Sequence, residues 1–106
     1  MAVSKYRAVK TEIDGITFAS KREAIRYSEL KLLVKAGYIR DLELQPKFPL
    51  VVNGIKVCIY IADFIYRGKD GSVCIEDAKG VRTPVYKLKN RLFHACYPSL
   101  RITEVP

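Results

Sequence analysis

Histidine, cysteine and long apolar runs are scarce in this sequence. It has one histidine and three cysteines without a CxxC pair, whereas zinc sites draw on several such side chains and disulfide scaffolds on an even number of cysteines. It has no apolar run of membrane-spanning length and no signal-peptide pattern. We therefore expect a soluble, intracellular protein without a zinc site, a disulfide framework or a membrane partner.

Acidic residues are few compared with basic ones. The 106 residues include 19 Lys and Arg but only 11 Asp and Glu, which gives a net charge of +8. A small domain this basic favours a polyanionic partner, most often nucleic acid, whose phosphates Lys and Arg would contact. The alternative is a basic protein whose charge serves solubility alone.

One α+β domain is predicted over residues 1–106, with a flexible basic N-terminus over residues 1–11. The length suffices for one core, and no repeat, linker or low-complexity tract divides the chain. Asp-Gly and Asn-Gly steps predict hairpins at Asp14-Gly15, Asn53-Gly54 and Asp70-Gly71. Strands are expected over residues 39–52, in a segment ending near Tyr66, and over residues 72–79 and 100–105. The three strands between the helices are expected to be antiparallel.

A first helix is predicted between Ser20 and Ala36. Ser20-Lys21-Arg22-Glu23 is a capping-box pattern, and Gly37 is a typical helix terminator. The expected core-facing stripe consists of Tyr27, Leu30 and Val34. Glu23 extends this stripe at the first turn and is therefore a candidate site residue, although capping of the helix explains it equally well.

A second helix is predicted from Pro84 to about Cys96, with Thr83 as its N-cap. Its expected inner stripe consists of Val85, Leu88, Leu92 and Ala95. The opposite face is a candidate surface for DNA and carries Lys87, Arg91 and His94, flanked by Lys89 and Asn90. A second candidate patch, on the first helix, consists of Lys21, Arg22 and Arg26. The alternative for both is an ordinary solvated helix face.

Charged side chains continue the apolar faces of two predicted strands. Because side chains alternate along a strand, one face carries Val57, Ile59, Ile61 and Asp63, and another carries Val73, Ile75, Asp77 and Lys79. Glu76 lies on the opposite face from Asp77. Buried charges are costly unless they are paired or bound to a metal, so a divalent cation is the simplest explanation. A plain ion pair between Asp77 and Lys79 is the alternative, but it leaves Asp63 unexplained.

The hairpin at Asp70-Gly71 sets which residues face each other. A three-residue loop over residues 69–71, with Gly71 left-handed, pairs 68 with 72 and therefore Asp63 with Asp77. Directly opposed residues have Cβ atoms about 4.5–5.5 Å apart, and two carboxylates that close raise one pKa unless a cation lies between them. A four-residue loop would shift the register by one and separate them.

These residues define a candidate metal site for phosphodiester hydrolysis. Asp63 and Asp77 would hold Mg²⁺ or Mn²⁺, with the carbonyl of Ala78 as a further candidate ligand. The metal would lower the pKa of a bound water and neutralise charge on the phosphate. Lys79 would supply a fixed cation or orient the water, and Glu23 would hold a water or a second metal.

Four segments in order resemble the PD-(D/E)xK nuclease superfamily, and among its members a small phage or prophage nuclease family of poorly defined substrate. The segments are Ser20-Lys21-Arg22-Glu23-Ala24, Leu44-Gln45-Pro46-Lys47-Phe48, Tyr60-Ile61-Ala62-Asp63-Phe64 and Asp77-Ala78-Lys79-Gly80. Ala62 stands where the superfamily name has proline. The predicted order of elements is similar to the restriction-endonuclease-like core, a helix, three antiparallel strands, a helix and a strand.

The resemblance implies a Mg²⁺-dependent DNA endonuclease with Glu23, Asp63, Asp77 and Lys79 as its catalytic residues. Several small members act as homodimers on branched DNA such as Holliday junctions. A short chain without a recognition insert is consistent with such structure-selective cutting, in phage recombination or replication within the bacterial cytoplasm. Two alternatives stay open: a non-catalytic nucleic-acid-binding module, and a basic scaffold protein that contacts a replication or packaging partner.

Overall fold

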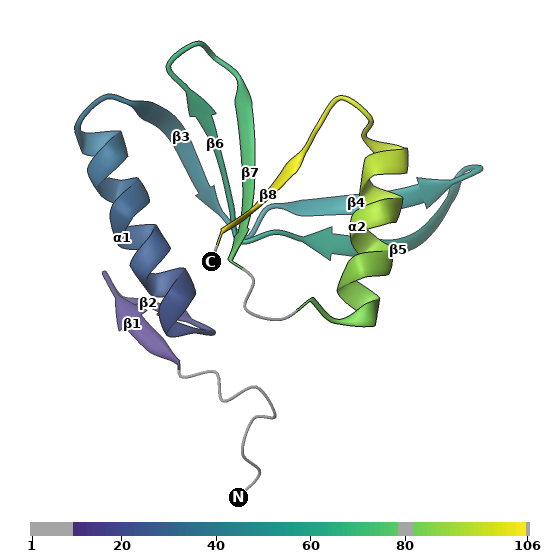
Figure 1. Ribbon diagram of the computed structural model, residues 1–106, viewed down its shortest axis with the longest axis horizontal. Coiled ribbons are helices and arrows are strands. Elements are labelled where there is room, and N and C mark those ends of the chain that lie inside the picture. Colours follow the sequence, from purple (N-terminus) through teal and green to yellow (C-terminus); the bar gives the residue numbers. More distant parts are fainter. Residues whose placement is uncertain (1–9, 79–81, 106) are drawn as a thin grey trace, which may run out of the picture.

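The caps and turns of the sequence define the elements of the computed structural model, which describes residues 10–78 and 82–105 (Figure 1). Its elements in chain order are strands β1 (Thr11–Ile13) and β2 (Ile16–Phe18), helix α1 (Lys21–Lys35), strands β3 (Ile39–Leu44), β4 (Lys47–Val52), β5 (Ile55–Ile61), β6 (Phe64–Gly68) and β7 (Val73–Ala78), helix α2 (Pro84–Cys96) and strand β8 (Ile102–Val105). The predicted α+β class is confirmed. Most of the expected flexible N-terminus lies outside the described residues, and Thr11 already belongs to β1.

Both helices begin at the predicted caps. The Ser20 hydroxyl oxygen accepts a hydrogen bond from the Glu23 backbone N–H at 3.1 Å, and the Thr83 hydroxyl oxygen accepts one from the Tyr86 N–H at 3.1 Å. These bonds satisfy amides that the first turn of a helix leaves unpaired. At the end of α1, Gly37 adopts φ +82°, a conformation that costs a residue without a Cβ little.

The hairpin between β6 and β7 has the predicted register. Gly71 has φ +84°, and the Gly68 N–H donates to the Ser72 carbonyl at 2.9 Å, which closes a three-residue loop. From there the pairing runs regularly to Phe64 opposite Glu76. One further step places Asp63 beside Asp77, as the sequence predicts.

Two of the predicted long strands are each broken in two. The first divides into β3 and β4 at Gln45-Pro46, and the second into β5 and β6 at Ala62-Asp63. Gln45 has φ +51°, and Pro46 has no N–H to donate to a ladder. The two breaks lie against each other, since the Gln45 N–H donates to the Asp63 carbonyl at 2.9 Å and the Ala62 N–H donates to the Pro46 carbonyl at 3.2 Å.

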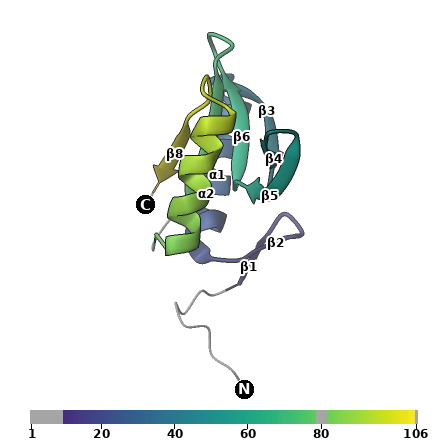
Figure 2. The same ribbon diagram turned by 90° about the vertical axis from the view of Figure 1, so that its right-hand side faces the viewer.

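These breaks create two separate sheets. The central sheet has the strand order β3-β6-β7-β8, with β8 parallel to β7 and the other neighbours antiparallel, whereas β4 and β5 form a two-stranded sheet of their own. Helix α1 packs on β3, and α2 packs on β4 and β5 at the other side of the molecule (Figures 1 and 2). The chain passes from one sheet to the other at Asp63.

A hydrophobic core lies on each side of the central sheet. The core under α1 consists of Phe18, Ala24, Tyr27, Leu30, Phe64 and Tyr66. The core under α2 consists of Leu50, Tyr60, Ala62, Ile75, Tyr86 and Phe93. Consecutive residues of β6 and β7 therefore enter different cores, and so do the neighbouring carboxylates of Glu76 and Asp77.

The predicted inner stripes of the helices are partly wrong. In α1, Tyr27 and Leu30 are buried as expected, but Val34 is exposed. In α2, Val85 and Leu88 are 64% and 67% exposed, and Ala95 is exposed as well, because Tyr86 and Phe93 face the core instead. The burial of two large aromatic rings outweighs that of smaller aliphatic side chains. The buried face of α2 is therefore rotated by about one residue, or 100°, from the predicted one.

The predicted apolar face before Asp63 is also wrong. Val57 and Ile61 are 58% and 49% exposed, while Tyr60 on the other face of β5 is buried. Asp63 therefore does not continue a buried stripe, and it reaches the interior because the chain turns at Ala62. The corresponding prediction for Asp77 is confirmed in part, since Ile75 and Asp77 are buried but Val73 is 39% exposed.

No helix within residues 10–78 and 82–105 is long and apolar enough to cross a membrane.

A buried ion pair joins α1 to the central sheet. Arg26 donates to both carboxylate oxygens of Glu76, at 2.6 and 2.8 Å, and the Tyr66 hydroxyl donates to the same carboxylate. The Glu76 side chain is 3% exposed, so its charge depends on these partners. This pair fixes the position of the helix that carries Glu23.

Replacement of Arg26 by methionine should destabilise the fold by about 3 kcal/mol, because it leaves the Glu76 carboxylate buried without its cation. Urea unfolding monitored by circular dichroism measures the change. Arg22→Met is the matched control, since Arg22 is exposed on the same helix and should change stability by less than about 0.5 kcal/mol. Equal losses in both variants would contradict the role of the pair.

Candidate functional site

Two carboxylates meet where β5, β6 and β7 come together. Asp63 lies at the turn between β5 and β6, and Asp77 lies near the end of β7 with 1% of its surface exposed. Their side chains share a hydrogen bond, so the Asp63–Asp77 pair that the register predicts is formed. Two carboxylates can share such a bond only when one of them holds a proton.

The environment of Asp63 favours its protonated form. Burial and the neighbouring Asp77 carboxylate raise the pKa of Asp63 to about 8, and the charge of Glu23 adds to this effect. One interaction opposes it: the backbone N–H of Ala78 donates to Asp63 Oδ2 at 2.6 Å and so favours the charged form. Near neutral pH the pair therefore holds less than its full charge of −2 in the absence of a cation.

Tyr60 is a residue of the site that the sequence did not indicate. Its hydroxyl donates to Asp77 Oδ2, and its ring is buried in the core under α2. Burial and the Asp77 carboxylate raise the pKa of Tyr60 far above its ordinary value, so this hydroxyl stays a donor. The alternation along β5 gave no signal, because it places Tyr60 on the face opposite Ile59 and Ile61, and the sequence predicted the face of Ile59 and Ile61 to be the buried one.

Glu23 lies across a small cavity from Asp63. The cavity has a volume of about 120 Å³ and is lined by Ile16, Thr17, Phe18, Glu23, Leu44, Gln45, Asp63 and Phe64. It has room for about four water molecules at roughly 30 Å³ each. The first turn of α1 thus brings Glu23 to the cavity beside Asp63 while its backbone N–H takes part in the cap, so both predicted roles are compatible.

Gln45 is a second residue that the sequence analysis did not place in the site. It lines the same cavity, and its φ of +51° is rare for a residue other than glycine, asparagine or aspartate. Its N–H donates to the Asp63 carbonyl, which fixes the turn that carries the carboxylate. A strained backbone beside a cluster of carboxylates is characteristic of functional sites.

The metal-ligand set is present only in part. Within the described ranges 10–78 and 82–105, no three His, Cys, Asp or Glu side chains form a cluster that could hold a metal ion. The pair of Asp63 and Asp77 supplies two carboxylates, and Mg²⁺ is commonly bound by one or two carboxylates with waters and phosphate completing its shell. Lys79 lies outside the described residues, and the carbonyl of Ala78 as a ligand stays a prediction.

One family model matches nearly the whole chain, and its description reads "Protein of unknown function (DUF1064)", over residues 3–105. The chain belongs to the DUF1064 family. No curated protein and no solved structure matches it. Because the family description names no activity, the resemblance of this DUF1064 chain to the PD-(D/E)xK nucleases stays a prediction.

The predicted DNA-binding face of this DUF1064 chain is reduced by internal bonds. On α2, Lys87 and Arg91 are exposed, but the Lys89 ammonium donates to the Ile59 carbonyl at 3.3 Å and the Asn90 amide donates to the Tyr86 hydroxyl at 3.2 Å. The His94 ring bonds the Asn90 carbonyl at 2.8 Å. Lys89 and Asn90 are therefore partly buried and engaged in bonds within the protein.

The second predicted patch loses a member in the same way. Lys21 and Arg22 are exposed on α1, whereas Arg26 is engaged with Glu76 and, at 3.2 Å, with Glu29. Arg26 thus supports the fold instead of offering a free cation to DNA.

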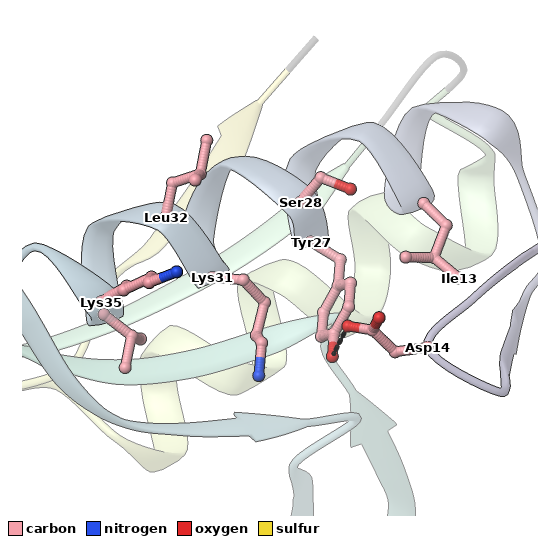
Figure 3. Close-up of a pocket in the computed structure, with 8 residues that line it drawn as sticks. Ile13, Asp14, Tyr27, Ser28, Lys31, Leu32 and Lys35 are labelled. Atoms are coloured by element: carbon pink, nitrogen blue, oxygen red, sulfur yellow. Dashed lines mark hydrogen bonds between the residues drawn. The ribbon is translucent and has the colours of Figure 1, made fainter.

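A wider cavity lies away from the carboxylate pair. It has a volume of about 510 Å³ between α1 and the β1–β2 hairpin, and Tyr27 closes one end through a hydrogen bond of 3.1 Å to Asp14 (Figure 3). Its lining includes Lys31, Lys35 and Leu32 but none of the predicted catalytic residues. The site is therefore identified by its chemistry rather than by cavity size.

Asp63→Asn should change the pH dependence of stability in metal-free buffer. A pKa raised from 3.8 to about 8 means that the stability contribution of Asp63 is complete below about pH 4 and is lost as the pH rises to about 8. At pH 8.5 the asparagine variant should therefore be more stable than wild type by about 2 kcal/mol, with little difference at pH 4. This gain is smaller than the full pKa shift would give, because Asp63 is partly exposed and solvent screens its charge. Urea unfolding at both pH values measures this.

Asp70→Asn is the control for this experiment, because Asp70 is exposed in the β6–β7 loop and Ser72 lowers its pKa. The Asp70→Asn variant should be no more stable than wild type at pH 8.5. If wild type and Asp63→Asn lose the same free energy of unfolding between pH 4 and pH 8.5, Asp63 is not the group whose ionisation lowers the stability.

Proposed function

We propose that this protein is a metal-dependent nuclease that hydrolyses phosphodiester bonds in DNA, with Asp63 and Asp77 as ligands of Mg²⁺ or Mn²⁺. The observation that carries the proposal is the contact between the buried Asp77 and the partly buried Asp63, beside the cavity that Glu23 lines. Packing two carboxylates together in a protein interior is unfavourable for folding, and pairs of this kind are concentrated at functional sites.

The donor set fits a hard divalent cation. Carboxylate oxygens are the ligands that Mg²⁺ and Mn²⁺ favour, and the small cavity leaves space for the waters that Mg²⁺ retains. A bound cation of this kind supplies charge neutralisation at the phosphate and a water of lowered pKa. None of the described residues that line this cavity is a histidine or a cysteine, the side chains on which most zinc sites draw.

The residues of the chain have separate tasks in this proposal. The Ala78 N–H and the Tyr60 hydroxyl fix the orientations of the Asp63 and Asp77 carboxylates. Glu23, on the other side of the cavity, accepts a hydrogen bond from the attacking water and orients it. Lys79 follows β7 by one residue in sequence, and its ammonium is proposed to stabilise charge that develops on the phosphate.

DNA is proposed as the substrate on the basis of charge. The net charge of +8 favours a polyanion, and Lys87 and Arg91 are exposed one turn apart on α2. The N-terminus of the same helix adds a partial positive charge. Branched DNA, homodimer formation and a role in phage recombination or replication rest on the superfamily resemblance and stay predictions.

A non-catalytic nucleic-acid-binding module is the second candidate function. It is favoured by the incomplete ligand cluster among the described side chains together with the basic surface. The two candidates differ in one measurable property, since only the nuclease cleaves DNA.

Asp77→Asn should abolish cleavage but not binding. We expect wild-type protein to cut at least one of a four-way junction, flap, nicked, linear or single-stranded DNA with Mg²⁺ or Mn²⁺, and to bind without cutting in Ca²⁺. The variant should lose about a thousandfold in rate, or about 4 kcal/mol of barrier stabilisation. Gel-based cleavage assays and fluorescence anisotropy measure the two properties.

Asp41→Asn is the matched control, because Asp41 is exposed on β3 and far from Asp77 in the sheet register. It should cleave like wild type. DNA binding without cleavage by wild type under every metal condition would instead establish the binding module, and absence of binding at low salt would favour the scaffold alternative.

Lys87→Ala combined with Arg91→Ala should weaken DNA binding and its salt dependence. Each phosphate contact contributes about one unit to the slope of log K against log salt, so the slope should fall by about two. The control is the double variant Lys31→Ala and Lys35→Ala, which removes two exposed lysines from α1. Equal changes in both double variants would show that binding follows net charge rather than the α2 face.

A further inference from the structure

Strand β7 carries two neighbouring buried carboxylates, and a tyrosine hydroxyl donates to each. On the α1 side, Tyr66 donates to Glu76, which also has the Arg26 guanidinium. On the α2 side, Tyr60 donates to Asp77, which also shares a hydrogen bond with Asp63. The two tyrosines thus make the same contact in different surroundings, one beside a cation and the other beside a second carboxylate.

The ring of Tyr60 is held by other aromatic rings. Its centroid lies 5.5 Å from that of Phe93 and 6.4 Å from those of Phe48 and Tyr86, and only 3% of the residue is exposed. A ring packed on several sides has little freedom to turn, so its hydroxyl occupies a defined position. Phe48 comes from β4, Phe93 from α2 and Tyr60 from β5, which makes the position a product of the whole second core.

One short segment supplies Tyr60 and Asp63, which both contact Asp77. Tyr60 is three residues before Asp63, and the chain turns at Ala62 as it passes from β5 to β6. The hydroxyl of Tyr60 and the carboxyl of Asp63 therefore reach Asp77 from the same segment. A carboxylate has about four lone-pair sites on two oxygens, and the bond from Tyr60 uses one site on Oδ2 and fixes the plane of the group.

We propose that Tyr60 is a positioning residue, whose hydroxyl orients the Asp77 carboxylate so that it and Asp63 bind one divalent cation together. This inference rests on the proposed function, because it assigns Tyr60 a task at the proposed metal site. Partners that orient the ligands of a metal commonly contribute about 10- to 100-fold in metal affinity. Tyr66, with its equivalent bond to Glu76, has a structural task and no part in metal binding.

The test compares Tyr60→Phe with Tyr66→Phe, each of which deletes one hydroxyl and keeps the ring. Mn²⁺ binding is measured without DNA by electron paramagnetic resonance, and the melting temperature of each metal-free variant is measured by circular dichroism. We expect Tyr60→Phe to lose about tenfold or more in Mn²⁺ affinity and Tyr66→Phe to stay within about twofold of wild type. In cleavage assays, Tyr60→Phe should lower kcat and leave the KM for DNA unchanged, since it does not touch the DNA.

The outcomes separate this inference from the proposed function. Wild-type binding of Mn²⁺ with unchanged affinity in Tyr60→Phe would overturn the role of Tyr60 and leave the metal site standing. An equal loss in Tyr66→Phe would also overturn it, because the effect would then come from general loosening of β7. If the wild-type protein binds no Mn²⁺, the metal site itself fails and the inference fails with it.

A measurement on the wild-type protein covers the case in which Tyr60→Phe does not fold. Mn²⁺ broadens nuclear magnetic resonance signals steeply with proximity, so substoichiometric Mn²⁺ should broaden the ring signals of Tyr60 before those of Tyr66, which lies on the other side of β7. Equal broadening of both rings, or earlier broadening of Tyr66, would overturn the proposal.

Discussion

The burial of carboxylates on β7 is the constraint on which the rest of the structure depends. Glu76 and Asp77 are 2% and 1% exposed, and because side chains alternate along the strand they enter the two cores on opposite sides of the sheet. An unpaired charge in either place would cost more than a small domain can lose. Each core therefore has to provide partners for a carboxylate, and the partners differ. Arg26 on α1 neutralises Glu76 permanently, whereas the Asp77 side contributes the hydroxyl of Tyr60 and a second acid, Asp63.

The chain break at Asp63 turns this constraint into a site. If β5 and β6 were one straight strand, Asp63 would belong to the face of Val57 and Ile61, which is exposed. The left-handed Gln45 and the proline after it stop the neighbouring strand at the same level, and the backbone bonds between the two breaks hold them together. The chain then enters the central sheet with Asp63 beside Asp77, close to the first turn of α1. The Arg26–Glu76 pair holds that helix on the sheet, so Glu76 also helps to place Glu23 at the cavity beside Asp63.

Features that depend on a few neighbouring residues could be predicted from the sequence, and features that depend on contacts between distant segments could not. The caps at Ser20 and Thr83 and the loop closed by Gly71 act over a few residues, and the loop alone fixes the Asp63–Asp77 register. The division into two sheets depends on contacts between segments about 17 residues apart, which no local pattern records. The inner face of α2 was misjudged for a related reason, since it depends on the aromatic cluster of Phe48, Tyr60 and Phe93 from three different elements. Tyr60 was missed because its partner is defined only once that cluster exists.

The two carboxylates of β7 also differ in whether a further partner would increase the stability of the fold. The Glu76 side is already complete, with a guanidinium and a hydroxyl on the same group. On the Asp77 side the pKa of Asp63 is raised, which means that the fold opposes full ionisation of the pair and would gain from a cation placed there. Evolution could remove this cost by replacing either aspartate with an apolar or amide side chain, as buried ion pairs in other proteins can be replaced without loss of stability. The raised pKa of Asp63 in one core, beside a neutralised carboxylate in the other, therefore supports the proposal that the Asp63–Asp77 pair serves binding rather than stability.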